Sequence, residues 1–165
     1  KNNTGKWITR IIYLIRNGDA MEIRIYYDDT DSGGVVYHAN YLKYFERGRT
    51  EYMRQRGADP KDMAEKGLIF VITHAELSFL APARYGDIIT VETFIEDISG
   101  ASIIFIYKIR LKGTEPRGVQ CREPIVVHGK PKLLVIGTTK IALVNREMKV
   151  QRLSDDFIKQ LKQTR

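Results

Sequence analysis

The chain has 165 residues, enough for one domain with a substantial core and too few for two domains of ordinary size. Hydrophobic residues make up 43% and charged residues 28%, which is typical of a globular protein. The net charge of +7 favours an anionic partner such as a phosphorylated ligand, but the basic residues are scattered, so no nucleic-acid partner is expected. A single cysteine, Cys121, excludes an intramolecular disulfide framework.

The first 20 residues differ from the rest. Trp7–Ile15 is apolar with basic flanks, as in a signal-peptide remnant, yet no small-residue cleavage site follows it. We therefore favour an extension outside the core over residues 1–20 and a single domain over 21–165. No apolar stretch reaches the roughly 20 residues that cross a membrane, so stable membrane insertion is not expected. We expect a cytoplasmic location.

The first predicted elements are a strand and a long helix. The strand is Glu22–Tyr27, rich in Ile and Tyr. Apolar residues then recur at three- and four-residue spacing, which predicts an amphipathic helix over 41–56. Gly57 and Pro60 end it. Gly48 lies on the apolar stripe, where the missing side chain lets the helix approach a sheet closely.

Four more strands and a short helix follow. The strands are predicted at 69–80, 87–97, 101–112 and 133–144. Most of their connections are too short for crossover helices, so they pair antiparallel. Residues 113–131 contain many Gly and Pro residues and predict a long loop or hairpin insertion, and Ser154 predicts the N-cap of a C-terminal helix. A sheet curled around the long helix buries both, which predicts a single α+β domain.

Asp31 is the leading candidate for chemistry. It lies in the run Asp31-Ser32-Gly33-Gly34, between the first strand and the long helix. The glycines let backbone approach a ligand, and the helix N-terminus offers free N–H donors and partial positive charge. A carboxylate there could attack a carbonyl or activate water, and a thioester suits it because a thiol of pKa about 8.5 leaves readily. The alternative is a residue that only makes the turn.

His38 and Tyr41 are the next candidates, near the helix start. His38 could donate to a thioester carbonyl or hold water, and its alternative is a polar residue at the helix end. Tyr41 could orient either group, and its alternative is a core aromatic. Asn40 fits a simple N-cap. The His residues and Cys121 lack the spacing of metal ligands, so neither a metal site nor a cofactor is expected.

Two segments resemble a known family. The run Tyr27–Arg49, YDDTDSGGVVYHANYLKYFERGR, and the turn Leu80–Asp87, LAPARYGD, are similar to the 4-hydroxybenzoyl-CoA thioesterase family of hotdog-fold proteins, and most similar to its YbgC-type acyl-CoA thioesterases. The resemblance implies a curved antiparallel five-stranded sheet wrapped around one long helix. It also implies homodimers or homotetramers, with the active site at the dimer interface.

The resemblance also assigns roles to residues. Asp31 falls on the family's catalytic aspartate, and His38 falls where a backbone N–H polarises the thioester carbonyl. The glycine turn contributes the candidate substrate-binding residues Gly33, Gly34 and Val35. Arg84 is a candidate contact for a coenzyme A phosphate, with a structural role at its own turn as the alternative. Residues 113–131 lengthen a connection that is usually short, and we favour a solvated loop over a cover for the acyl entrance.

The predicted function is hydrolysis of acyl-CoA or acyl-carrier-protein thioesters to free acid and thiol, with coenzyme A as part of the substrate rather than a cofactor. The alternative is a binding module of the cell envelope that holds an acyl thioester or a protein without turnover. No signature of a hotdog hydratase is present. Chain length and aromatic preference do not follow from these residues.

Overall fold

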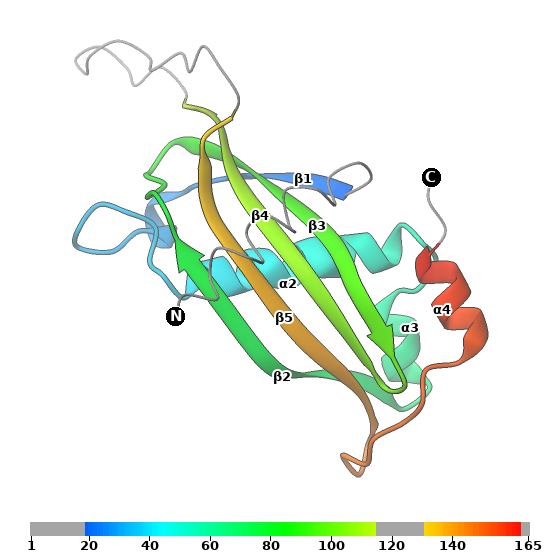
Figure 1. The fold of residues 1–165 in the computed structure, drawn as a ribbon. Coiled ribbons are helices and arrows are strands. Elements are labelled where there is room, and N and C mark those ends of the chain that lie inside the picture. The colour runs from blue at the N-terminus through cyan, green and yellow to red at the C-terminus, as the bar shows by residue number, and fades with distance from the viewer. Residues whose placement is uncertain (1–18, 115–130, 163–165) are drawn as a thin grey trace, which may run out of the picture.

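The computed structural model describes residues 19–114 and 131–162 (Figure 1). The elements are, in chain order, β1 (Asp19–Arg24), the 3-10 helix η1 (Tyr27–Asp29), α2 (Asn40–Arg54), α3 (Pro60–Glu65), β2 (Leu68–Phe79), β3 (Asp87–Ser99), β4 (Ser102–Thr114), β5 (Leu133–Asn145) and α4 (Asp155–Lys162). No helix among these residues is long and apolar enough to cross a membrane.

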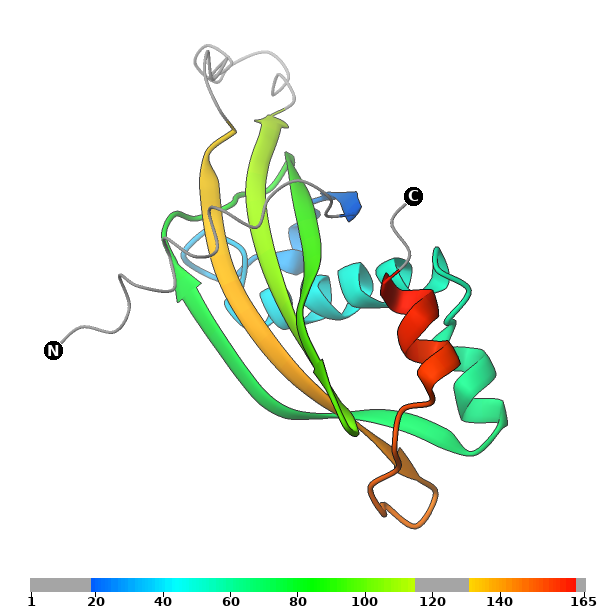
Figure 2. The ribbon, with the colours of Figure 1, turned by 45° about the vertical axis from the view of Figure 1, so that its right-hand side comes forward.

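The five strands form one antiparallel sheet in the order β1-β3-β4-β5-β2. The sheet curves around α2, which lies in its hollow, while α3 and α4 cover one end (Figures 1 and 2). β1 and β2 are the edges. The predicted α+β architecture and antiparallel pairing are therefore confirmed, and the loop between β1 and α2 lies at the end of α2 away from α3 and α4.

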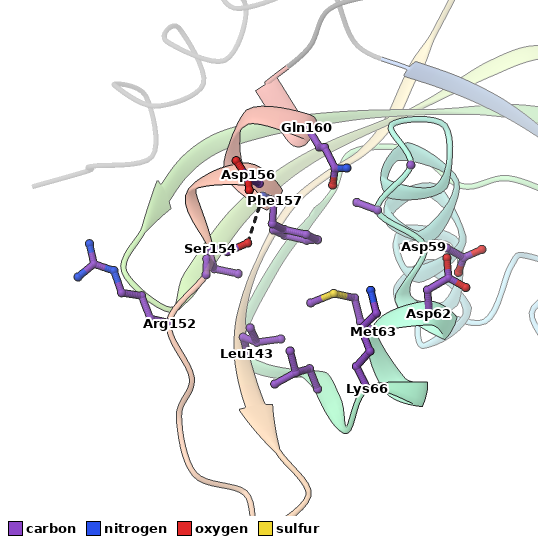
Figure 3. Close-up of a pocket in the computed structure, with 14 residues that line it drawn as sticks. Asp59, Asp62, Met63, Lys66, Leu143, Arg152, Ser154, Asp156, Phe157 and Gln160 are labelled. Carbon is purple, nitrogen blue, oxygen red and sulfur yellow. Dashed lines mark hydrogen bonds between the residues drawn. The ribbon is translucent and has the colours of Figure 1, made fainter.

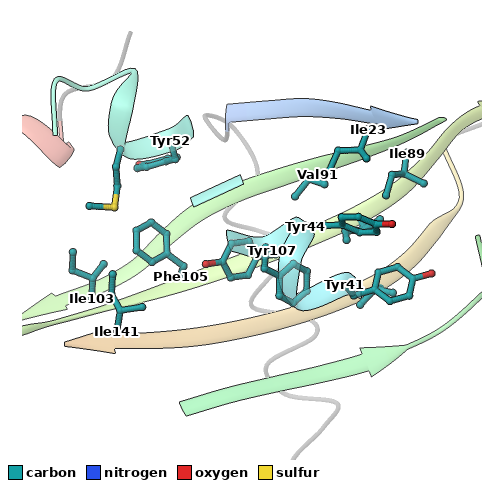
Figure 4. Close-up of a cluster of buried hydrophobic side chains, with 14 of the residues drawn as sticks. Ile23, Tyr41, Tyr44, Tyr52, Ile89, Val91, Ile103, Phe105, Tyr107 and Ile141 are labelled. Atoms are coloured by element: carbon teal, nitrogen blue, oxygen red, sulfur yellow. The ribbon is translucent and has the colours of Figure 1, made fainter. Parts of the chain in front are cut away.

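Aromatic packing holds α2 against the sheet (Figure 4). The Phe45 ring stacks on Tyr107 at 4.3 Å between centroids, and Tyr52 packs edge-on against Phe105 at 5.9 Å. At Gly48 the helix comes so close to β3 that an added Cβ would lie 2.6 Å from Thr93 Oγ1. The close approach predicted for Gly48 is therefore real.

Several element ends are shifted from the prediction, and three differences have a local reason. β1 begins at Asp19, which pairs with Thr93, so the last two residues of the predicted extension belong to the sheet. Its end at Arg24 is earlier than predicted, because the chain turns into η1. α3 is absent from the prediction: Pro60, which the sequence predicts as the stop of the long helix, occupies the first turn of a new helix whose N-cap is Asp59. Residues 1–18 and 115–130 lie outside the described residues.

α4 confirms the predicted cap. Ser154 Oγ accepts a hydrogen bond from Phe157 N at 3.2 Å. The helix buries Phe157 and Leu161, and the Phe157 ring stacks on Phe70 at 5.9 Å. α4 is thereby attached to the core over β2, at the end of the sheet opposite the loop between β1 and α2.

Candidate active site

Asp31 lies in a closed loop, here called the Asp31 loop (residues 30–36). Thr30 and Val36 form an antiparallel bridge across its base. Inside it, Asp31 N donates to Val35 O and Gly34 N donates to Asp31 O, each at 2.9 Å. Gly34 has φ +70°, a left-handed conformation that glycine adopts without strain. The residues Asp-Ser-Gly-Gly therefore form the predicted tight turn.

The Asp31 carboxylate is partly used by this turn. Its Oδ1 accepts a hydrogen bond from Gly33 N at 2.8 Å. An added Cβ at Gly33 would lie 3.1 Å from that oxygen, so glycine leaves room for the contact. Oδ2 receives no hydrogen bond from the part of the chain that the structure describes. One oxygen of the Asp31 carboxylate therefore stabilises the turn, while the other remains available to a ligand.

A hollow of about 470 Å³ lies beside the loop. The residues that line it are Tyr27, Thr30, Asp31, Ser32, Gly34 and Tyr85. Tyr27 and Tyr85 meet edge-on at 6.4 Å between ring centroids. The volume falls within the range of small-molecule sites, about 300–1,000 Å³, so the acid borders a space that can admit a thioester. Val35 does not line this hollow, whereas Gly34 does.

The Pro-Ala-Arg turn, which leads into β3, supports the Asp31 loop. Val36 N donates to Ala83 O at 2.9 Å, and Arg84 Nη1 donates to Gly34 O at 3.3 Å. Arg84 N also donates to Asp87 Oδ2 at 2.8 Å. Arg84 is thus a structural contact of the loop and places a positive charge next to it, while the phosphate contact stays a prediction.

The start of α2 lies beyond the same loop. Its N-cap is Ala39, and no side chain caps the helix, so neither Asn40 nor His38 has the simple capping role. The His38 side chain is exposed and its ring lies 4.4 Å from that of Tyr37. Among the described residues, the backbone N–H groups of His38 and Ala39 find no acceptor. These are free donors at the electropositive end of α2.

Tyr41 is a core aromatic, as its alternative interpretation stated. It is 3% exposed, its hydroxyl accepts a weak hydrogen bond from Ala83 N at 3.4 Å, and its ring meets Tyr44 and Phe79 edge-on. Burial raises the pKa of the Tyr41 phenol. Within the described residues the Tyr41 hydroxyl makes no hydrogen bond to Asp31 or His38, so it does not orient either side chain.

Comparison with known proteins decides the family. The model of the thioesterase-like superfamily matches residues 26–161. This chain belongs to the thioesterase-like superfamily. The predicted resemblance is therefore confirmed, and with it the hotdog fold.

Similar members have been named in several bacteria. A Haemophilus influenzae protein called acyl-CoA thioesterase YbgC is 41% identical over 93 residues, which cover 56% of this chain and 68% of that protein. The Helicobacter pylori protein of the same name is 40% identical over 99 residues, covering 58% and 72%. The matched part spans about two thirds of the curated relatives' length.

Solved structures show the same fold. A probable thioesterase from Bartonella henselae superposes with a TM-score of 0.68 at 34% identity, covering 83% of this chain and 99% of that one. The 4-hydroxybenzoyl-CoA thioesterase from Pseudomonas sp. strain CBS-3 has a TM-score of 0.72 at 20% identity, covering 88% and 99%. At that identity the second likeness concerns the fold alone.

A second hollow, with a volume of about 320 Å³, lies between α3, α4 and β5 (Figure 3). Ala58, Leu143, Leu153 and Phe157 on its walls are almost fully buried already. No candidate from the sequence lies in this second hollow, so the hollow beside Asp31 is the better site.

Two polar groups near the site are absent from the sequence predictions: the backbone carbonyl of Asp29 and the hydroxyl of Tyr44. Asp29 O accepts hydrogen bonds from Tyr37 N and from Asn40 Nδ2, both at 2.9 Å. Among the described residues the buried Tyr44 hydroxyl has no partner at hydrogen-bond geometry, and burial and the nearby Asp29 carboxylate raise the pKa of that phenol well above its usual range. A polar Asn40 directly beside the apolar stripe was the available signal. Within the described residues no cluster of metal-ligating side chains occurs.

Proposed function

We propose that this protein hydrolyses acyl-CoA or acyl-carrier-protein thioesters to a free acid and a thiol. The observation that carries the proposal is the Asp31 carboxylate at the wall of a hollow, in the same loop that leads to free N–H donors at the start of α2. The names of the relatives point to the same reaction. Coenzyme A is part of the substrate, and the reaction needs no further cofactor.

The chemistry follows from these two features. Asp31 Oδ2 either attacks the carbonyl carbon, forming an anhydride that water then cleaves, or removes a proton from the water that attacks. In both routes the carbon–sulfur bond breaks and the thiol leaves as its thiolate. The N–H of His38 would donate to the developing oxyanion, an interaction typically worth about 3–4 kcal/mol. The partial positive charge of the α2 N-terminus favours the same charge.

The test is release of free thiol from a panel of acyl-CoA esters that differ in chain length and aromaticity. Wild-type protein is expected to turn over at least one ester, and Asp31→Asn is expected to lose most of that activity. Binding without thiol release across the panel would instead support the non-catalytic module. One observation favours that second candidate: Asp31 Oδ1 is already held by Gly33 N as in an ordinary turn.

We also propose a homodimer, and a homotetramer built from it, in the cytoplasm, where acyl-CoA esters are metabolised. β2 supports the dimer. It is an edge strand of 12 residues, paired only with β5 within the described sheet, and its middle is exposed, with Ile72 52% accessible. A long exposed edge with apolar side chains is a template for pairing with another chain. Phe79, 54% exposed, lies on this strand and contacts Tyr41, so a partner would approach the site.

A further inference from the structure

We propose that Asn40 is a positioning residue for catalysis: its side-chain amide fixes the start of α2 relative to the loop that carries Asp31. This inference rests on the proposed thioesterase function. Asn40 is the first residue of α2 and only 6% exposed. Its Nδ2 donates to Asp29 O at 2.9 Å. Because a carbonyl oxygen can only accept, the amide must present its NH₂ group to Asp29.

The contact joins the two sides of the site. Asp29 lies two residues before Asp31, and Asn40 lies two residues after His38. Asp29 is itself anchored on the β1 side, where its Oδ2 accepts from Tyr26 N at 2.9 Å. The bond from Asn40 therefore connects the fixed base of the Asp31 loop directly to the helix end that carries the free N–H donors.

Among the residues that the structure describes, the Asn40 amide makes no other hydrogen bond. A polar side chain at a helix start normally accepts from the helix's own N–H groups, but the α2 N-terminus makes no such bond. The Asn40 side chain instead donates backwards, to the preceding element. If it is removed, Asp29 O keeps the bond from Tyr37 N, so no buried acceptor is stranded. The loss should therefore loosen the site without unfolding the protein.

The size of the effect follows from geometry. Catalytic groups misplaced by about 1 Å lose about a hundredfold in rate. We expect Asn40→Ala and Asn40→Asp to lower kcat about 10- to 100-fold on the best acyl-CoA ester while KM changes less than about threefold. Asn40→Asp keeps the shape and places a negative charge at the helix N-terminus, which favours the helix, but at neutral pH it cannot donate to Asp29 O.

A matched control separates position from stability. Thr139→Val removes a buried hydrogen bond of the same length, 2.9 Å from Tyr107 OH to Thr139 Oγ1, within the core under the sheet. It should lower the melting temperature about as much as Asn40→Ala does and leave kcat unchanged. Rates are expressed per folded molecule, with the folded fraction measured by circular dichroism at the assay temperature.

The outcomes are distinct. A lower kcat in both Asn40 variants, with KM and folded fraction near wild type, supports the positioning role. Unchanged kcat per folded molecule, or a raised KM with unchanged kcat, overturns that role and leaves the thioesterase proposal intact. If wild-type protein releases no thiol from any ester, the thioesterase proposal fails and takes this inference with it.

Discussion

Replacement of Asp31 by Asn separates the turn from the chemistry. The amide oxygen of Asp31→Asn can still accept from Gly33 N, the 2.8 Å bond that closes the turn, while the negative charge is lost. The free energy of unfolding should therefore stay within about 0.5 kcal/mol of wild type. Loss of a general base or nucleophile should lower kcat by about 10²- to 10⁴-fold.

Asp31→Ala is the matched comparison. It loses the charge and the hydrogen bond from Gly33 N, so it should show a similar fall in kcat and an added loss of about 1 kcal/mol in stability. The assay is continuous thiol release at saturating acyl-CoA, with calorimetric unfolding in parallel. Protein mass should be verified before each run, because Asn followed by Ser deamidates to Asp. If Asp31→Asn retains more than a tenth of the wild-type kcat, the assigned role of the carboxylate is wrong.

Three further outcomes are expected. Gly48→Ala gains about 1 kcal/mol of helix propensity but places a Cβ 2.6 Å from Thr93 Oγ1. Because such overpacking costs about 1–3 kcal/mol, calorimetry should show a lower melting temperature. Burial lowers the pKa of Lys108 to about 8, so between pH 8 and 10 the unfolded chain binds more protons than the folded one. Stability in denaturant titrations should therefore rise with pH across this window, and less so in Lys108→Met. Ile72→Lys places a charge on the exposed edge of β2 and should shift the mass measured by light scattering toward that of the monomer. An unchanged mass would count against a dimer formed through the β2 edge.

Hydrophobic periodicity predicted the fold because α2 and β3 each bury one regular face. The three- and four-residue spacing along α2 and the alternation along β4 are written directly in the sequence, and short turns leave antiparallel pairing as the solution. Pro60 shows where such reasoning ends. Proline both stops one helix and suits the first turn of the next, and the sequence pattern does not choose between them.

Side-chain roles at the site were harder to predict than elements. Asp31 could be singled out because its residue type, glycine neighbours and helix-start position agree. Asn is a frequent N-cap, so the sequence predicts that role for Asn40, but in the structure Ala39 is the cap and the Asn40 amide donates to Asp29 O. Which backbone carbonyl a side chain can reach depends on the path of the chain in the folded structure. Local residue spacing does not encode that path.

The two motifs noticed separately in the sequence form one structural unit. In the Leu80–Asp87 turn, Ala83 O accepts a hydrogen bond from Val36 N, and the Arg84 side chain donates to Gly34 O, so the turn between β2 and β3 supports the Asp31 loop. An exposed carboxylate is normally free to rotate, and fixing it in a reactive geometry then costs entropy in the transition state. Here the loop is closed at its base, supported from β3 and anchored through one carboxylate oxygen, which leaves the second oxygen with a fixed direction. Catalysis requires this ordering of the Asp31 carboxylate before the reaction, since the carboxylate has no buried partner. Its conformational entropy is then lost on folding rather than in the transition state.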